Sequence, residues 1–469
     1  MYRYWLIFGL MLITFAAESK IYLPNILGDN MVLQRNTSVK FWGKSTPLSS
    51  VKIMVSWNKE AIIETMSNSN GDWSVIFKTP NAGGPYNIKI SDEEELVLNN
   101  ILIGDVWICS GQSNMNMPVK GFKSQPVLYS MDAIVRADER LPIRIFTVDK
   151  KFSKEKLDNA GGKWNNHSGR DVSEFSAVGY FFGKELCERL NIPIGLISTS
   201  WGGSTIEAWM PEDILKMFPE ISLEHLNSNK ELKRPFQAAS MLFNSMLYPL
   251  NSVAIKGFIW YQGESNIGRP KLYEKLFSEF IGYIRNVYNN QELPFYYAQI
   301  APFGYSDKSG ISSAVFREIQ YNCEKKIPHT GMAVLMDIGD EKCIHPANKK
   351  QVGERLAYLA LQNDYGYDFI NANSPRYISK EIKNDKIILT FDTEKEGLTS
   401  YGKELKCFEI SSSDKVFHPA KAIIHGNNVI VWNEDVKNPV AVRYAFKNYI
   451  VGDLFGTNGL PVSSFRTDF

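Results

Sequence analysis

The chain has 469 residues, of which 44% are hydrophobic and 13% aromatic, enough apolar material for two or three domains. Its 52 Lys and Arg residues almost balance its 51 Asp and Glu residues, and no run of five like charges occurs, so a nucleic-acid partner is not expected. The five cysteines show no Cys-x-x-Cys spacing, which argues against structural zinc and against a dense disulfide framework.

The first 19 residues have the pattern of a secretory signal peptide. One arginine precedes an apolar stretch from Trp5 to Ala16, and small residues follow it. We therefore expect residues 1–19 to be removed and the protein to be secreted or periplasmic. The stretch is shorter than the roughly 20 apolar residues that cross a bilayer, and no later segment reaches that length, so no membrane span is expected.

Residues 20–99 are predicted to form an N-terminal β domain. Short strand-like segments alternate with turn signals such as Asn70-Gly71, and no helical periodicity is present. The strand-like segments cover residues 38–43, 51–57, 73–77 and 86–90. This spacing is typical of a small antiparallel sandwich.

Residues 100–366 are predicted to form an α/β domain. Apolar strands alternate here with longer amphipathic stretches that have helical spacing. The expected strands are 102–109, 194–198, 255–260, 295–300 and 331–336, and the expected helices are 176–190, 271–289 and 350–361. Such alternation indicates a parallel sheet with helices on both faces.

Residues 367–469 return to short strands without helical periodicity. The expected strands are 386–390, 420–424, 428–432 and 441–444. The chain is therefore predicted to have three parts, with a β domain on each side of the α/β domain.

Small and polar residues follow several strands of the α/β domain. Ser113 comes just after the first strand, where open α/β sheets build their sites, and its own amide can face an oxyanion. A lone Gly-x-Ser is usually only a turn that caps a helix, so Ser113 gains weight from the other strand ends. After the second strand, Gly202 or Gly203 can bring a backbone amide close to a substrate oxygen because neither has a Cβ.

Two further strand ends supply the remaining groups of an acyl-transfer site. Asn266 follows the third of these strands and can donate its side-chain N–H to an oxyanion. His345 lies between the last strand and the next helix, where it can take the proton from Ser113 and return it to the leaving alcohol. The six histidines show no metal-ligand spacing, so no metal is expected.

Four ordered blocks of the chain resemble the SGNH hydrolases, and among them the sialate O-acetylesterase group. The blocks are Gly111-Gln-Ser-Asn-Met115, Trp201-Gly-Gly-Ser-Thr-Ile206, Trp260-Tyr-Gln-Gly-Glu-Ser-Asn266 and Ile344-His345-Pro346. The resemblance implies a flavodoxin-like, three-layer hydrolase domain flanked by β-sandwich-like segments. It also implies an esterase without a cofactor, with Ser113 as nucleophile and His345 as base.

The oxyanion hole implied by this resemblance consists of the amides of Ser113 and Gly202 or Gly203 and the side chain of Asn266. The orienting acid is less clear, because Lys342 and Cys343 stand where relatives carry an acidic residue. Asp340, Glu341 and Asp337 lie just upstream and are candidates for that acid, with Asp340 the first choice. The alternative is a Ser-His dyad whose ring is held by a backbone carbonyl.

Side chains beside the catalytic candidates are predicted to bind the substrate. Aromatic rings can pack on a sugar face, while polar and charged groups bind its hydroxyls and carboxylate. The candidates are Gln112, Trp201, Tyr261, Glu264 and Arg269, with Arg269 as the cation for the carboxylate of a sialic acid.

The leading hypothesis is a secreted carbohydrate esterase that removes O-acetyl groups, in the first place from sialic acids, through a serine acetyl-enzyme. One alternative is an esterase that deacetylates xylan or another plant glycan. Another is a glycan-binding homologue with weakened catalysis, suggested by Lys342 and Cys343 at the position of the acid.

Overall fold

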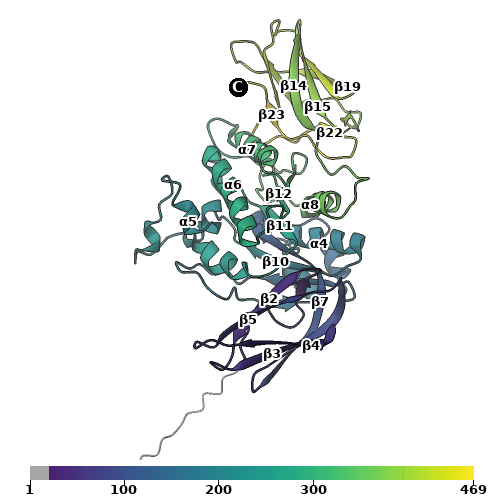
Figure 1. Cartoon of the computed structure of the whole chain (residues 1–469). Coiled ribbons are helices and arrows are strands. Elements are labelled where there is room, and N and C mark those ends of the chain that lie inside the picture. The colour runs from purple at the N-terminus through teal and green to yellow at the C-terminus, as the bar shows by residue number, and fades with distance from the viewer. Residues whose placement is uncertain (1–20, 395, 469) are drawn as a thin grey trace, which may run out of the picture.

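The structure is a computed structural model that describes residues 21–394 and 396–468. The signal-peptide prediction for residues 1–19 lies outside these residues. Figure 1 shows three parts in a row, with an α/β body between two β-rich ends. Within the described ranges, no helix has both the length and the apolar character needed to cross a membrane.

The body is built on a parallel sheet with the strand order β13-β12-β11-β7-β10-β8. These strands are β7 (Glu95–Gly111), β8 (Ile143–Thr147), β10 (Ile194–Ser200), β11 (Gly257–Tyr261), β12 (Phe295–Ala298) and β13 (Thr330–Ala333). The short antiparallel strand β9 (Trp164–Asn165) pairs with β8 at one edge. This sheet confirms the predicted α/β class.

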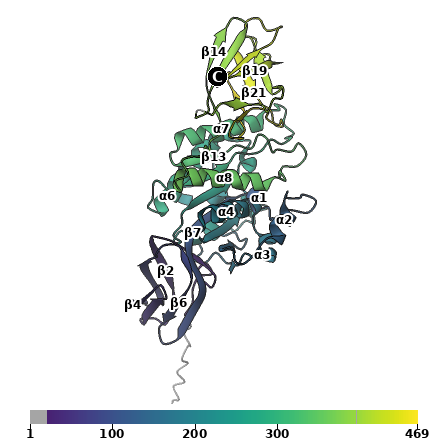
Figure 2. The same ribbon diagram turned by 90° about the vertical axis from the view of Figure 1, so that its right-hand side faces the viewer.

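Helices cover both faces of the sheet. One face carries α4 (Ala177–Leu190) and α8 (Lys349–Asp364), which lie side by side in Figure 2, and the other carries α6 (Pro270–Val287) and α7 (Ser312–Lys326). The helix α4 begins where Ser176 Oγ accepts the N–H of Gly179 (3.1 Å), and it ends at Asn191 in the left-handed conformation.

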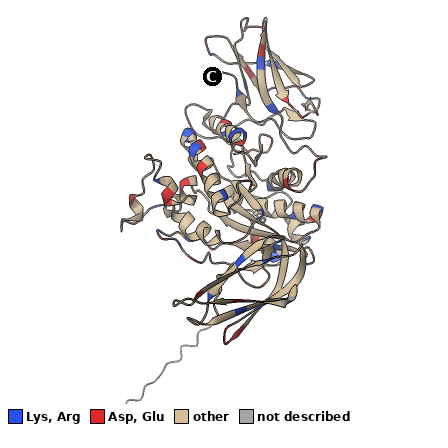
Figure 3. Cartoon of the chain, viewed as in Figure 1, with Lys and Arg blue, Asp and Glu red and all other residues tan. Residues whose placement is uncertain are grey.

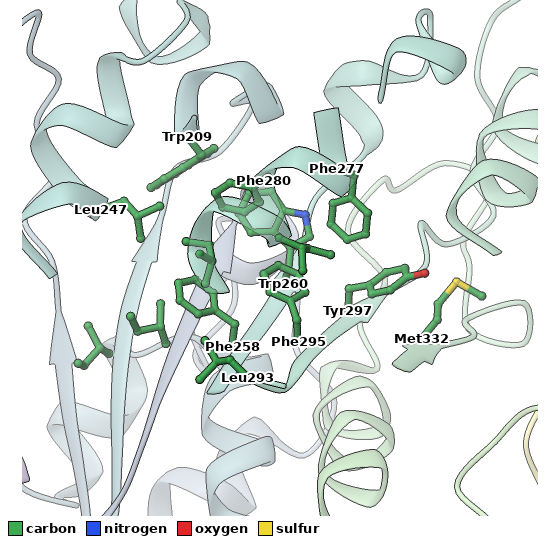
Figure 4. Close-up of a cluster of buried hydrophobic side chains, with 14 of the residues drawn as sticks. Trp209, Leu247, Phe258, Trp260, Phe277, Phe280, Leu293, Phe295, Tyr297 and Met332 are labelled. Atoms are coloured by element: carbon green, nitrogen blue, oxygen red, sulfur yellow. The ribbon is translucent and has the colours of Figure 1, made fainter. Parts of the chain in front are cut away.

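Alternate residues of each strand point to opposite faces, which explains the two apolar cores. Phe258 and Trp260 of β11 pack toward α6, where the Trp260 and Phe280 rings lie 5.1 Å apart (Figure 4). Ile259 between them belongs to the core under α4 and α8. A strand covered on both faces needs apolar residues at every position, as the sequence of β11 has.

The strand β7 joins the N-terminal part to the body without an intervening loop. Its first half pairs antiparallel with β6 (Gly83–Ser91), and its second half pairs parallel with β10 and β11. The predicted boundary at 99/100 therefore falls inside a continuous strand, and β7 belongs to one eleven-stranded sheet of the described chain. The other strands of the N-terminal part are β1 (Val32–Gln34), β2 (Ser38–Lys44), β3 (Ser50–Val55), β4 (Asn58–Met66) and β5 (Asp72–Lys78).

A buried carboxylate holds this junction together. Asp105 in the middle of β7 is 1% exposed. Its carboxylate accepts hydrogen bonds from Gln34 Nε2 (2.7 Å), Arg35 Nε (2.9 Å) and the Tyr365 hydroxyl (2.9 Å). The N-terminal part, the sheet and the end of α8 therefore meet at one side chain.

The C-terminal part consists of small antiparallel sheets, as the sequence predicts. Their strands are β14 (Arg376–Lys383), β15 (Lys386–Asp392), β16 (Leu398–Thr399), β17 (Phe408–Ser411), β18 (His418–Pro419), β19 (Lys421–His425), β20 (Asn428–Trp432), β21 (Ala441–Tyr444), β22 (Phe455–Gly456) and β23 (Phe465–Arg466). The fully buried Arg317 of α7 fixes this part to the body, because it donates to Ser464 Oγ (3.0 Å) and to the Lys447 carbonyl (2.6 Å).

Short helices fill the connections of the body. They are α1 (Ser113–Asn116), α2 (Ser130–Val135), α3 (Gly169–Glu174) and α5 (Glu212–Leu215). Figure 3 shows basic and acidic residues interspersed over the visible parts of the chain, as expected from the balanced composition.

Candidate active site

Three of the predicted site segments leave the sheet side by side. The strands β10 and β11 lie on opposite sides of β7, and all three are parallel, so their carboxyl ends meet at one edge. The chain reverses its direction across the sheet between β10 and β11, and ligands of open α/β sheets bind at such a point. Ser113, Gly202 and Asn266 follow these three strands, and Ser113 is partly exposed.

Two backbone amides beside Ser113 are free to bind an anion. A Cβ built on Gly202 would lie 3.4 Å from Cβ of Ser113, so these two residues are in contact. Across the described residues, neither the N–H of Ser113 nor the N–H of Gly202 donates to a protein acceptor. The N–H of Gly203 has no acceptor among the described residues either, but Gly203 lies beside Phe236 in the left-handed region (φ +75°) and makes no such contact with Ser113. The geometry therefore favours Gly202 over Gly203 as the second amide donor.

Asn266 is held in a buried network and is 2% exposed. Its side-chain oxygen accepts from the N–H of Ile206 (3.0 Å) and from Gln262 Nε2 (2.7 Å), and its nitrogen donates to Glu207 Oε2 (2.9 Å). One N–H of the amide is used in that bond. The other has no acceptor within the described part of the chain, which leaves it available to an oxyanion.

Within the described residues, His345 uses Nδ1 in a hydrogen bond and its Nε2 has no partner. Its Nδ1 lies 2.6 Å from Gln125 Oε1, and the Phe122 ring packs edge-on at 5.4 Å between centroids. An amide oxygen only accepts hydrogen bonds, so Nδ1 carries the proton and Nε2 carries the lone pair. Burial, together with the nearby charge of Lys349, lowers the pKa of His345 to about 4. The imidazole is therefore neutral, as a general base must be.

Asn114, next to Ser113 in the chain, contacts the loop that carries His345. Its side-chain nitrogen donates to the carbonyl of Ile344 (3.1 Å), the residue before His345, and to Glu264 Oε1 (2.5 Å). Lys349 Nζ donates to the oxygen of the same amide. Burial lowers the pKa of Lys349 to about 7 against the attraction of Glu264, and burial raises the pKa of Glu264. This buried cluster fixes Ser113 and His345 relative to one another.

The structure does not place Asp340 in the role of the orienting acid. Asp340 is exposed, and its Oδ1 accepts from the backbone N–H groups of Lys342 (2.8 Å) and Cys343 (2.9 Å). Asp337 pairs with Arg355 instead. No carboxylate of the described residues bonds to His345, so its partner is the neutral amide of Gln125. Sequence reasoning missed Gln125 because it lies 220 residues upstream in a loop without a motif.

Several predicted substrate contacts have structural roles. Tyr261 is fully buried beneath Lys349, whose Nζ lies 5.7 Å from the ring centroid, so its ring packs inside the protein and is not exposed as a platform for a sugar. Glu264 is 8% exposed and holds Asn114, as described above. Arg269 pairs with Glu207 (2.5 Å), the same carboxylate that holds Asn266. Arg269 therefore stabilises the oxyanion side of the site and has its own counter-ion.

Gln112 and Trp201 line the surroundings of Ser113 more directly. Gln112 Oε1 accepts from the N–H groups of Gly263 (3.4 Å) and Ser265 (3.3 Å), which joins the first and third strand ends. Trp201 is partly exposed and stacks on Phe236, with centroids 5.9 Å apart and planes 8° from parallel. Of the predicted aromatic platforms, Trp201 is the one that remains accessible.

Comparisons with known proteins identify the family of this chain. Residues 103–362 match the family model described as carbohydrate esterase, sialic acid-specific acetylesterase. A sialate O-acetylesterase from Homo sapiens is 30% identical over 431 residues, which cover 82% of this chain and 79% of that protein. A sialate O-acetylesterase from Mus musculus is 28% identical over 516 residues, 94% of this chain and 93% of that protein.

A solved structure is similar over nearly the whole chain. It is a carbohydrate acetylesterase from Xanthomonas citri, 34% identical, with a TM-score of 0.87, and the match covers 96% of this chain and 100% of that one. The fold, the converging strand ends and the family match thus lead to one conclusion. The chain is an esterase and belongs to the sialic acid-specific acetylesterase family of carbohydrate esterases.

Proposed function

We propose that this esterase hydrolyses O-acetyl esters of sialic acids through an acetyl-enzyme on Ser113, and that it acts outside the cytoplasm. The observation that carries the mechanism is the contact of Ser113 with Gly202, because the N–H groups of both residues are free within the described structure. Two such donors beside a serine can stabilise the oxyanion of a tetrahedral intermediate.

In the first half-reaction, Ser113 Oγ attacks the acetyl carbonyl carbon while His345 Nε2 takes the hydroxyl proton. The amides of Ser113 and Gly202, with the free N–H of Asn266, bind the oxyanion. The ester C–O bond then breaks, and His345 returns the proton to the departing sugar hydroxyl. In the second half-reaction, water attacks the acetyl-enzyme, His345 takes its proton, and acetate leaves as Ser113 is protonated again.

Gln125 takes the place of the usual acid in this scheme. It holds His345 in the tautomer that exposes Nε2, although a neutral amide stabilises the imidazolium less than a carboxylate would. Orientation is thus retained, while the basicity of His345 is reduced. This arrangement is a Ser-His dyad supported by an amide.

The sialic acid substrate is supported by the family match and by the names of the relatives in Homo sapiens and Mus musculus. A second candidate is a neutral acetylated glycan. It is favoured by the Xanthomonas citri relative, which has the higher identity and is described only as a carbohydrate acetylesterase.

The proposal is tested by measuring acetate release from O-acetylated sialic acid and from acetylated xylan. We expect the faster release from the sialic acid, and Ser113→Ala should lower turnover by at least about three orders of magnitude. Ser278→Ala is the matched control, because Ser278 lies on α6 and only donates back to the helix carbonyl of Glu274. Mass spectrometry of the wild-type protein should find an acetyl group on Ser113 after rapid quenching.

If acetate were released faster from xylan, the protein would be a plant-glycan deacetylase and the proposed sialic acid substrate would be wrong. Binding of sialic acid without any acetate release would support the weakened, glycan-binding alternative. Full activity of Ser113→Ala would refute the serine mechanism. Export is tested separately, by N-terminal sequencing of the protein recovered from the periplasm or the medium, which should begin near residue 20.

A further inference from the structure

Lys150 lies near the turn that carries Ser113 and forms no ion pair with a carboxylate of the described residues. Lys150 follows β8, and its Nζ donates to Asn116 Oδ1 (2.9 Å) and lies 5.9 Å from the Trp201 ring centroid. Asn116 is three residues after Ser113 on α1, so the two side chains share one face of that turn. Trp201 directly precedes Gly202. Lys150 therefore lies between the two segments that carry the nucleophile and the oxyanion amide.

Lys150 lines a pocket of about 350 Å³ next to the catalytic groups. Phe122, which packs on the His345 ring, forms part of the same wall. Ser198 and Ser200, at the carboxyl end of β10, form another part. The catalytic candidates themselves do not line the pocket, which adjoins them through Asn116 of α1 and through Phe122.

The pocket contains one cation without a carboxylate partner and one buried hydroxyl without a hydrogen-bond partner among the described residues. Within the described chain, no carboxylate forms an ion pair with Lys150, whereas Glu174, which also lines the pocket, pairs with Lys120 (2.5 Å). Asp149 also lines the pocket and, like Lys150, is exposed, and it forms no ion pair with Lys150. Ser200 is 4% exposed, and its hydroxyl has no partner among the described residues. A buried hydroxyl without a partner is costly unless a ligand or water completes it.

We propose that Lys150 and Ser200 form an anion subsite that binds the carboxylate of a sialic acid while Ser113 attacks its acetyl ester. This inference rests on the proposed function and adds the residues that select the charged substrate. The ammonium of Lys150 and the hydroxyl of Ser200 both donate to the carboxylate oxygens. Arg269, the cation expected from the sequence, is already paired with Glu207.

The subsite gives the enzyme a way to distinguish substrates by charge. An acetylated xylose unit has no carboxylate, so it gains nothing from Lys150. A hydrogen bond to a charged group that replaces solvent corresponds to about a 10- to 100-fold difference in kcat/KM. A preference of this size would make an O-acetylated sialic acid a better substrate than a neutral acetylated glycan.

The test compares an O-acetylated sialic acid with its methyl ester at the carboxyl group. The two substrates differ in charge and keep the same sugar and acetyl ester. For the wild-type enzyme we expect kcat/KM to be at least about tenfold higher for the free acid. Lys150→Met should bring the ratio of the two kcat/KM values close to one, and Lys150→Arg should retain most of it. Lys151→Met, which removes an exposed neighbouring charge, should leave the ratio unchanged.

A binding measurement separates this inference from the proposed function. Unacetylated sialic acid, the product, is titrated into the wild-type protein and into Lys150→Met, and the dissociation constant of the variant should be about tenfold weaker or more. Equal dissociation constants, or a ratio of kcat/KM values that Lys150→Met does not change, would overturn the subsite. If the wild-type enzyme released no acetate from sialic acids, the proposed function would be wrong. The binding measurement would still decide whether Lys150 binds the carboxylate.

Discussion

Two regions of β7, the middle of the strand at Asp105 and the turn after it at Ser113, use polar groups in opposite ways. At Asp105 a buried carboxylate meets donors from Gln34, Arg35 and Tyr365, so its charge is fully used inside the protein. At Ser113, just after the strand, two backbone N–H groups make no bond within the described structure. The first region stabilises the fold, and the second keeps hydrogen-bonding capacity for a ligand.

The difference shows why burial and pairing together are better guides to function than residue type alone. Glu264, Arg269 and Tyr261 are of the right type for substrate contacts, but the protein itself uses or covers them. Ser113 and Gly202 look ordinary, but their amides are free. If the comparison is correct, changes in the two regions should affect activity and stability separately.

The largest effect is expected for His345→Ala. Loss of the general base should lower kcat by about three to four orders of magnitude with little change in the unfolding temperature. Turnover of a chromogenic acetyl ester and a thermal melt check the two halves of this prediction. Wild-type turnover in His345→Ala would show that another residue acts as the base.

The next effect is on stability and comes from Asp105→Ala. Removal of one partner of a buried ion pair costs about 3–5 kcal/mol in the free energy of unfolding, because Arg35 and Tyr365 lose their acceptor. Asp72→Ala is the matched control, since the Asp72 pair with Lys44 is exposed to solvent and its loss should cost far less stability. Denaturant unfolding measures both. Similar losses in the two variants would contradict the role given to the Asp105 junction.

A smaller effect, on pH dependence, is expected at Gln125. The site needs neutral His345, so kcat/KM should be retained above the pKa of His345 and lost as the pH falls through about 4. In Gln125→Glu, a carboxylate next to the imidazolium favours the protonated form and should move this limb upward by about one to three pH units. Gln291→Glu, on an exposed loop, should leave the limb in place. If the pH profile of Gln125→Glu were unshifted, the side chain at position 125 would not contact the imidazole that acts as base.

The smallest effect is expected for Asp340→Asn. The asparagine oxygen can still accept the N–H groups of Lys342 and Cys343, so kcat/KM should change by less than about threefold. A loss comparable to that of His345→Ala would restore Asp340 as the catalytic acid. The measurement thus decides between a triad and the amide-supported dyad.

Much of this architecture could be predicted from the chain because local patterns determine it. The alternation of apolar strands and amphipathic helices predicted the parallel sheet, and polar residues after the strands predicted which edge carries the site. The partner of His345 could not be predicted, since Gln125 is brought to it only by the path of an irregular loop. The burial of Tyr261 was also out of reach, because in this strand apolar residues face both layers.

The continuity of β7 limits how this protein can be divided or recombined. A fragment that begins at residue 100 would start within a strand, lose the pairing with β6 and leave Asp105 without Gln34 and Arg35. The N-terminal β part is therefore not an interchangeable module that can be exchanged with that of another esterase by cutting a linker. Domain shuffling at this position would have to preserve the strand, and with it the orientation of the N-terminal part relative to Ser113.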